Sequence, residues 1–364
     1  MLNEVLNHVF EVETYKELDY AFVNEFFKNG FDLSGGCSAV VKTLADGTTI
    51  MGRNMDLNIS RKPAYIVRTD VENHYKTVGL AYIFTKEAPD YEEVKSNGIP
   101  EMFRKGLPFI TTDVLNEKGL YIEINMRMSE CWPNGEPKFV CTGTNPDAKD
   151  RIFVTMLGRY VGENCASVDE AIEYVKTLDI FTGLDTHAWN FCYLMADKSG
   201  HYGLLEIAQN KVIWHDYQNA QTNFYIDKEL SKQQLYKAGV GRYEYITKHI
   251  DSVTTKEEMY ILMKDISYFQ MYENNGCPYD VRSEFVANKP HFTYEYLMDE
   301  NNKEEFEETM KDIQSRVLGK PRSFVEGRAK NWESTFTIVT DCNNKEMFVR
   351  FFEDDERTIT LKVE

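Results

Sequence analysis

Cys37 combines a reactive side chain with an unusual sequence neighbourhood. It follows Ser34, Gly35 and Gly36 and precedes a run of strand-forming residues. If the bond between Gly36 and Cys37 is cut, the cysteine gains a free α-amine beside its thiol. Such an amine has a pKa of ~7.7–8, so it can act as a general base at neutral pH. The two glycines give the backbone freedom for attack of the thiol on the preceding carbonyl. The alternative is a turn followed by a small buried residue.

Arg53 and Asp56 are the next side chains with chemical potential. They lie in the segment Gly-Arg-Asn-Met-Asp at residues 52–56. A guanidinium near a thiol favours the thiolate, and a carboxylate near an amine can hold and orient it. An exposed ion pair of little energetic value is the alternative.

A β-hairpin is expected to bring these groups together. Residues 38–43 and 48–53 flank an Asp46-Gly47 turn, so the far end of the second strand returns beside Cys37. Further hairpins are expected at 109–125, 191–207 and 335–352, with a last strand at 358–363. Strands joined by tight turns pair antiparallel.

Helical patterns lie between the hairpins, near residues 146–161, 168–177, 229–250 and 255–270. This order indicates an α+β fold with helices packed on the faces of the sheets. The charged, irregular segment 271–330 is expected to be an insertion or a flexible loop.

Residues 1–36 are expected to form a helical leader. Apolar residues recur with helical spacing at Leu2, Val5, Leu6 and Val9. Thr14 and Glu17 resemble a capping box that opens a second helix. Glu4 stands where an export signal carries positive charge, so a secretory signal is not expected. We therefore expect a propeptide, removed or docked, followed by one catalytic domain over 37–364.

Composition excludes several classes of protein. The 364 residues include 42% hydrophobic side chains, which argues against a mainly disordered chain. Acidic residues outnumber basic ones 59 to 41, so no nucleic-acid partner is expected. No apolar stretch is long enough to predict a membrane span. Seven dispersed cysteines without a CxxC pair predict buried thiols in a reducing compartment and no metal site.

The motifs together resemble the choloylglycine hydrolase and penicillin V acylase family of N-terminal-nucleophile amidases. Cys37 with residues 52–56 is similar to the opening motif of that family, Cys followed by G-R-N-x-D. Further similar segments follow in order: 116–125 (N-E-x-G-L, ending in Asn125), His187 to Glu206, Thr222-Asn223, Gly241-Arg242-Tyr243 and 332–341. The resemblance covers roughly residues 37–364.

This resemblance implies a four-layer αββα fold with two stacked antiparallel sheets. It also implies a site built from Cys37, Arg53, Asp56, Asn125, Asn223 and Arg242, without metal or cofactor. Cys37 would be the nucleophile and Asp56 would orient its α-amine. Arg53 and Arg242 would supply positive charge, and the two asparagines would stabilise the oxyanion. His187 is assigned a structural role.

The activity implied is hydrolysis of linear C–N amides through a thioester on an autoprocessed cysteine. The substrate would be a small amphipathic amide, such as a conjugated bile acid, an N-acyl amino acid or penicillin V. The enzyme would be a cytoplasmic homotetramer. Three alternatives stay open: a papain-like protease with a downstream histidine, a non-catalytic binding module, and an acyltransferase of the same superfamily.

Overall fold

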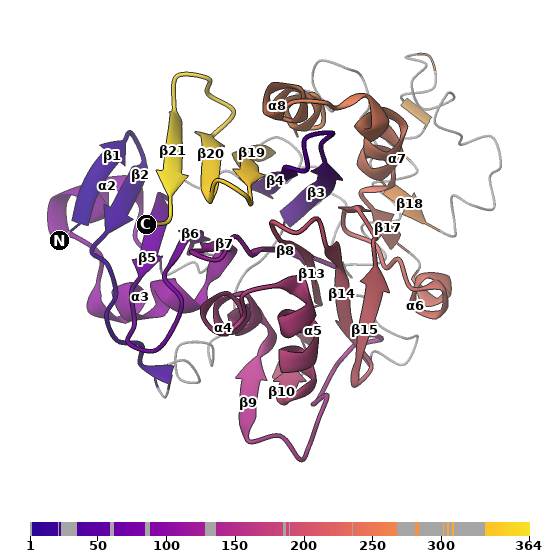
Figure 1. Ribbon diagram of the computed structural model, residues 1–364, viewed down its shortest axis with the longest axis horizontal. Helices are drawn as coiled ribbons and strands as arrows, with labels where there is room; N and C mark the ends of the chain where they lie inside the picture. Colours follow the sequence, from indigo (N-terminus) through magenta and orange to yellow (C-terminus); the bar gives the residue numbers. More distant parts are fainter. Residues whose placement is uncertain are drawn as a thin grey trace.

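Two stacked, mainly antiparallel sheets form the centre of the molecule (Figure 1). The computed structural model describes residues 2–20, 22, 35–58, 62–83, 88–127, 136–184, 187–188, 190–234, 236–267, 281–283, 301, 304–305, 308 and 332–364. The large sheet has nine strands in the order β1 (Leu2–Leu6), β2 (Val9–Val12), β5 (Ala64–Thr69), β6 (Thr77–Tyr82), β7 (Thr111–Asn116), β8 (Tyr121–Met126), β13 (Phe191–Ala196), β14 (Tyr202–Ala208) and β15 (Lys211–Asp216). The small sheet has six, in the order β16 (Ala220–Gln221), β3 (Gly35–Thr43), β4 (Thr49–Asn58), β19 (Trp332–Asp341), β20 (Glu346–Phe351) and β21 (Thr358–Lys362).

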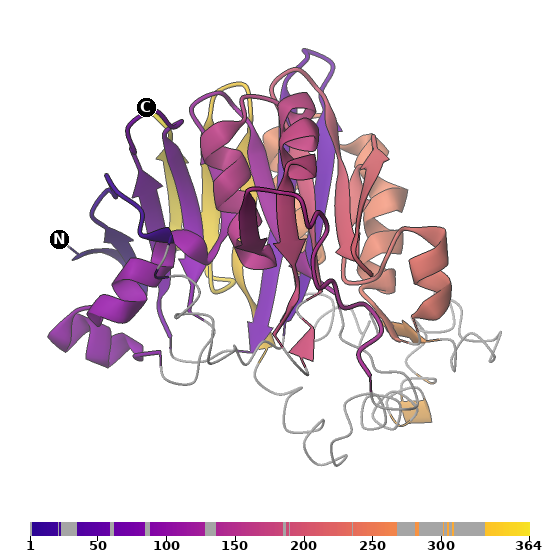
Figure 2. The same ribbon diagram turned by 90° about the horizontal axis from the view of Figure 1, so that it is seen from below.

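Helices cover the outer face of each sheet, as the views in Figures 1 and 2 show. On the large sheet these are α4 (Leu157–Asn164) and α5 (Val168–Lys176), and on the small sheet α7 (Val240–His249) and α8 (Lys256–Asp265). Shorter elements connect the layers: α2 (Tyr91–Asn97), α3 (Glu101–Gly106), α6 (Lys228–Gln233), and the paired strands β9 (Asp150–Phe153) with β10 (Leu178–Phe181), β11 (Gly183–Leu184) with β12 (His187–Ala188), and β17 (Tyr236–Ala238) with β18 (Val281–Ser283). The expected α+β fold with four αββα layers is confirmed.

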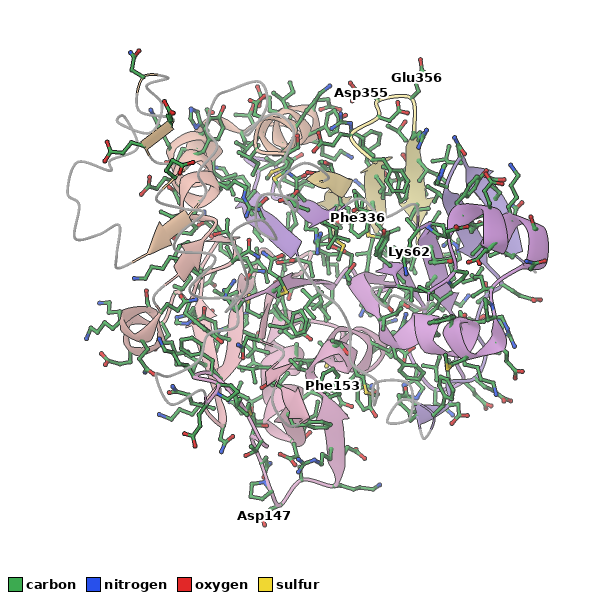
Figure 3. All side chains as sticks on the ribbon, turned by 180° about the vertical axis from the view of Figure 1, so that it is seen from behind. Lys62, Asp147, Phe153, Phe336, Asp355 and Glu356 are labelled. Carbon is green, nitrogen blue, oxygen red and sulfur yellow. The ribbon has the colours of Figure 1, made fainter. Side chains whose placement is uncertain are left out.

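Strand alternation divides the apolar side chains among three layers of core. On β4, Met51 and Met55 face the large sheet, whereas Ile50 faces the helices α7 and α8. Successive side chains of a strand point to opposite faces, so a strand covered on both sides is apolar on both. Phe336 of β19 lies between the sheets, near the middle of the molecule in Figure 3. The layer between the sheets is also where the thiol of Cys37 lies.

The start of the leader is a β-hairpin, so the helix expected there is wrong. Strands β1 and β2 pair antiparallel, and β2 continues the large sheet by pairing parallel to β5. Val9 is buried between the sheets, while Phe10 is buried on the helix-covered face. The apolar residues of this short segment fit a helical stripe, but the free edge of β5 offers backbone hydrogen bonds and two apolar faces. The capping box expected at Thr14 and Glu17 is also wrong, because residues 13–19 are not helical and Tyr15 forms an isolated parallel bridge with Thr69. The later part of the expected second helix, residues 21 and 23–26, and nearly all of 271–330 lie outside the described residues.

Truncating Phe10 tests how firmly the leader belongs to this fold. Phe10→Ala is expected to lower the free energy of unfolding by about 3–5 kcal/mol, because a buried aromatic ring leaves a cavity. Urea unfolding followed by circular dichroism measures this change. Asn3→Ala, on the exposed part of β1, is the control and should change stability little. Equal effects of the two substitutions would contradict a buried leader.

Of the helices that the structure describes, none is both long enough and apolar enough to cross a membrane.

Candidate active site

The β3–β4 hairpin places Cys37 and Arg53 on one face and Asp56 on the other. Cys37 lies opposite Met55 and Gly36 opposite Asp56 in the register of the two strands. Alternation then directs the thiol and the guanidinium into the layer between the sheets. Asp56 points to the outer face of the small sheet, beside the backbone that joins Gly36 to Cys37. The nucleophile therefore has its sulfur on one side of the sheet and its nitrogen within reach of groups on the other.

Arg53 is the cation beside the thiol. It is fully buried, and its Nη2 lies 3.8 Å from Sγ of Cys37 and 3.0 Å from the backbone oxygen of Ile124. Burial nevertheless raises the pKa of Cys37 to about 11, against the opposing effect of Arg53. With the leader attached, the thiol is therefore protonated at neutral pH. The thiolate expected from the nearby arginine does not form by charge alone, and the site needs a base.

Asn223 holds the nitrogen of Cys37, and Arg242 links Asn223 to Asp56. Arg242 of α7 donates through Nη1 to Oδ2 of Asp56 at 2.8 Å and through Nη2 to Oδ1 of Asn223 at 2.8 Å. The same Asn223 oxygen accepts from the backbone N–H of Cys37 at 3.0 Å. All three side chains are buried. The carboxylate, guanidinium and amide form a rigid chain that ends on the nitrogen of the nucleophile.

Asn223 makes a contact that differs from the expected one. The family resemblance implied that its side chain donates to the oxyanion, and that role stays a prediction; in the folded chain its Nδ2 donates to the backbone oxygen of Met126 at 2.7 Å. Its oxygen faces Cys37 instead, because Arg242 and the Cys37 N–H both require an acceptor there. Asn223 is therefore placed to orient the nitrogen of the nucleophile.

Asn125 lies on β8, across the layer between the sheets from the hairpin. With its amide nitrogen turned toward Glu123, it donates to Oε2 of Glu123 at 2.8 Å and to the backbone oxygen of Ile124 at 3.2 Å. Arg53 donates to that same Ile124 oxygen. The structure thus joins Asn125 to Arg53 through one peptide group of β8. All six residues predicted for the site belong to one buried network around Cys37.

Gly239 allows α7 to deliver Arg242. It precedes the helix with a φ of 86°, and a Cβ there would lie 2.4 Å from the side chain of Thr222. Only glycine readily accepts both the left-handed backbone and this close approach. The start of α7 therefore packs directly on the Thr222-Asn223 segment.

Several residues that support the site were not predicted from the sequence. Ser334 of β19 donates to Oδ1 of Asp56, next to a bulge that sets it opposite that residue. Arg127 donates to the backbone oxygen of Thr222 and, at 3.1 Å, to Glu206. The buried acids Asp113 and Glu123 lie on either side of the Arg53 Nε, at 3.1 and 3.6 Å. For Asp113 and Glu123, a charged residue at an inward position of a strand was the signal that could have revealed them.

Of the remaining described thiols, Cys192 borders this network: its Sγ donates to the side-chain oxygen of Gln221 at 2.6 Å and to the backbone oxygen of Asn125 at 3.5 Å. Among the described cysteines, Cys141, Cys165, Cys192 and Cys342 are buried and free, as expected for packing residues. Cys131 and Cys277 lie outside the described residues. His187 contributes backbone to β12, and its side chain is outside the described set. Within the described part of the chain, no group of three His, Cys, Asp or Glu side chains is arranged to hold a metal ion.

Comparisons with known proteins agree with the resemblance expected from the motifs. A family model described as "Acyl-coenzyme A:6-aminopenicillanic acid acyl-transferase" matches residues 105–283, which include Asn125, Asn223 and Arg242. The expected resemblance to amidases and acyltransferases of this type is confirmed. No curated protein shows significant sequence similarity to the chain.

Two similar solved structures are those of enzymes. One is a conjugated bile acid hydrolase from Clostridium perfringens, with 14% identity, coverage of 90% of this chain and 92% of that chain, and a TM-score of 0.48. The other is a penicillin V acylase from Agrobacterium tumefaciens, with 14% identity, coverage of 86% and 83%, and a TM-score of 0.42.

Proposed function

We propose that the protein is a cysteine amidase of the N-terminal-nucleophile type that hydrolyses linear C–N amides. The observation that carries this proposal is the pair of contacts at Cys37. Its sulfur faces Arg53 at 3.8 Å, and its nitrogen is held by Asn223 at 3.0 Å within the Asp56–Arg242 chain. A structural cysteine does not need its own backbone nitrogen held by a buried charged network. Among the described residues, no histidine is hydrogen-bonded to Cys37, which favours this proposal over a papain-like protease.

Maturation begins at the bond between Gly36 and Cys37. The thiol attacks the carbonyl carbon of Gly36, the carbon–nitrogen bond breaks, and the nitrogen takes a proton to become the α-amine. Water then hydrolyses the resulting thioester, which releases the carboxyl group of Gly36 and the thiol. A Cβ on Gly36 would lie 3.1 Å from Nη2 of Arg242, so a glycine suits the crowded position before the cleaved bond.

Catalysis by the mature site proceeds by acyl transfer in two steps. The α-amine takes the thiol proton while the sulfur attacks the substrate carbonyl, and the ammonium then protonates the leaving amine. Water hydrolyses the thioester and regenerates the thiol. Asp56 and Asn223 hold the amine, while Arg53 and Arg242 supply positive charge to the site. We retain Asn125 as the oxyanion donor, by its side chain or its backbone N–H.

The leader is proposed to stay docked after cleavage. Strand β2 lies inside the large sheet with Val9 fully buried, so release would expose apolar surface and an unpaired edge of β5. Native mass spectrometry of the active protein should give the mass of the full chain plus one water. Denaturing conditions should separate residues 1–36 from 37–364. Detection of 37–364 alone under native conditions would contradict docking.

A panel of amides tests the proposed reaction. Glycine and taurine conjugates of bile acids, penicillin V and long-chain N-acyl amino acids are incubated with the protein and with Cys37→Ala. We expect cleavage of at least one class by the wild type only. An acyltransferase is the second candidate, favoured by the description of the matched family. Adding an amine acceptor distinguishes the two, because a transferase forms a new amide faster than free acid. No turnover of any class would argue against the amidase. The tetramer stays a prediction of the family resemblance, and the cytoplasmic location stays a prediction from the lack of an export signal in the sequence.

A further inference from the structure

Glu123 lies at the centre of the buried network, although no step of the proposed mechanism uses it. It is fully buried on β8. Its Oε2 lies 3.6 Å from Nε of Arg53 and 2.8 Å from the nitrogen of the Asn125 amide. Its Oε1 accepts from Gln221, two residues before Asn223. The Glu123 carboxyl group thus contacts Arg53 and Asn125 of the predicted site, and also Gln221 in the segment that carries Asn223.

The charges around Arg53 do not balance when every acid is ionised. Arg53 faces Asp113, Glu123 and Cys37, three groups that can each carry one negative charge. Asp113 accepts from Tyr121 at 2.7 Å and from Thr112 at 2.8 Å, in addition to its ion pair with Arg53 at 3.1 Å. Glu123 has the longer contact with Arg53, 3.6 Å against 3.1 Å, so Arg53 compensates its negative charge less than that of Asp113. Burial raises the pKa of Glu123 to about 8, against the opposing effect of Arg53.

The titratable groups that interact with Glu123 come from five strands and from the residue that follows β8. They are Cys37 on β3, Arg53 on β4, Asp113 on β7, Tyr121 on β8, Arg127 directly after β8, and Cys192 and Tyr193 on β13. Of these groups, Cys37 and Glu123 both compete for the single positive charge of Arg53. Ionisation of one therefore opposes ionisation of the other.

We propose that Glu123 is a positioning residue that holds Arg53 and Asn125 against Cys37, and that its charge opposes ionisation of the thiol. The inference deepens the proposed function and rests on it for the role of Cys37. A glutamine at this position keeps the size and the hydrogen-bonding capacity of the side chain but removes the charge. A leucine removes the charge and the contacts with Arg53, Asn125 and Gln221.

The pH dependence of Cys37 alkylation by iodoacetamide tests the charge. The rate is followed on the Cys37 peptide by mass spectrometry, so the other thiols do not interfere. In Glu123→Gln the midpoint should move to lower pH by about one unit, because the competing negative charge is gone. Glu163→Gln is the matched control, since Glu163 is also buried and paired with an arginine, Arg159, at 3.3 Å. A Glu123→Gln profile that coincides with wild type and with this control would overturn the proposal.

Steady-state kinetics test the positioning role. Glu123→Leu should lower kcat at least tenfold more than Glu123→Gln, with a smaller change in KM, because it frees Arg53 and Asn125. Equal kcat in the two variants would contradict positioning. If the leucine variant does not fold, the alkylation profile of Glu123→Gln still decides the proposal. Alkylation does not depend on substrate turnover, so it tests the role of Glu123 even if the amidase assignment fails. Failure of that assignment would be seen separately, as substrate turnover retained by Cys37→Ala.

Discussion

Cys37→Ala should abolish both amide hydrolysis and cleavage of the leader. The substitution removes the only atom that the proposed mechanism uses as nucleophile, so the loss in kcat should be roughly 10⁴-fold or more. Alanine fits the buried position beside Met55 and leaves the neighbouring charged network intact. Product formation by liquid chromatography and the mass of the purified chain measure the two effects.

Cys165→Ala is the control for removal of a buried thiol. Cys165 follows α4 on the outer side of the large sheet and has no contact with Arg53 or Asp56. This variant should keep wild-type turnover and wild-type processing. A Cys37→Ala protein that retains turnover would exclude Cys37 as the nucleophile, and the reaction would then have to use a different residue.

Asp56→Asn should produce the second large loss of activity. The variant keeps the shape of the side chain and its contact with Ser334 but removes the negative charge that faces Arg242. Arg242 then loses the partner that fixes its contact with Asn223, so the nitrogen of Cys37 is no longer held. We expect kcat/KM to fall by about 10²–10³-fold, similar to the loss of one preorganised group in other acyl-transfer sites.

A second ion pair that contains a buried aspartate provides the control for Asp56→Asn. Asp179 is buried and pairs with Arg151 at 2.9 Å, far from the hairpin in sequence and on the β9–β10 pair. Asp179→Asn should reduce thermal stability without reducing kcat/KM. If both variants lose stability and neither loses turnover, Asp56 belongs to the scaffold and not to the site.

The site hairpin could be predicted because its signals are local. An Asp-Gly turn, two β-branched runs and a two-residue period are enough to set Cys37 and Arg53 on one face of β3 and β4. The helices α5 and α8 were recognisable for the same reason, since Ser167 and Thr255 cap their first turns.

The leader could not be predicted, because its structure depends on a distant strand. The stripe of Leu2, Val5, Leu6 and Val9 fits a helix, and no local feature excludes one. The strand forms instead of the helix because the edge of β5 supplies backbone hydrogen-bond partners to β2. Tertiary pairing therefore overrides the local pattern.

The supporting residues of the site depend on three-dimensional contacts that the sequence does not display. Glu123 shares one face of β8 with Tyr121 and Asn125, but its contacts there with Arg53 and Gln221 come from other strands. Ser334 contacts Asp56 from a strand 278 residues away in sequence. The acceptor role of Asn223 follows from the donors that converge on it, which only the folded chain brings together.

The mass of the active protein under denaturing conditions tests the central claim most directly. We predict a large fragment that begins at Cys37, with activity that rises in proportion to its abundance as processing proceeds. A fully active preparation that consists of the intact chain, with Cys37 still joined to Gly36, would contradict this claim, because the nucleophile would then lack the amine that serves as its base.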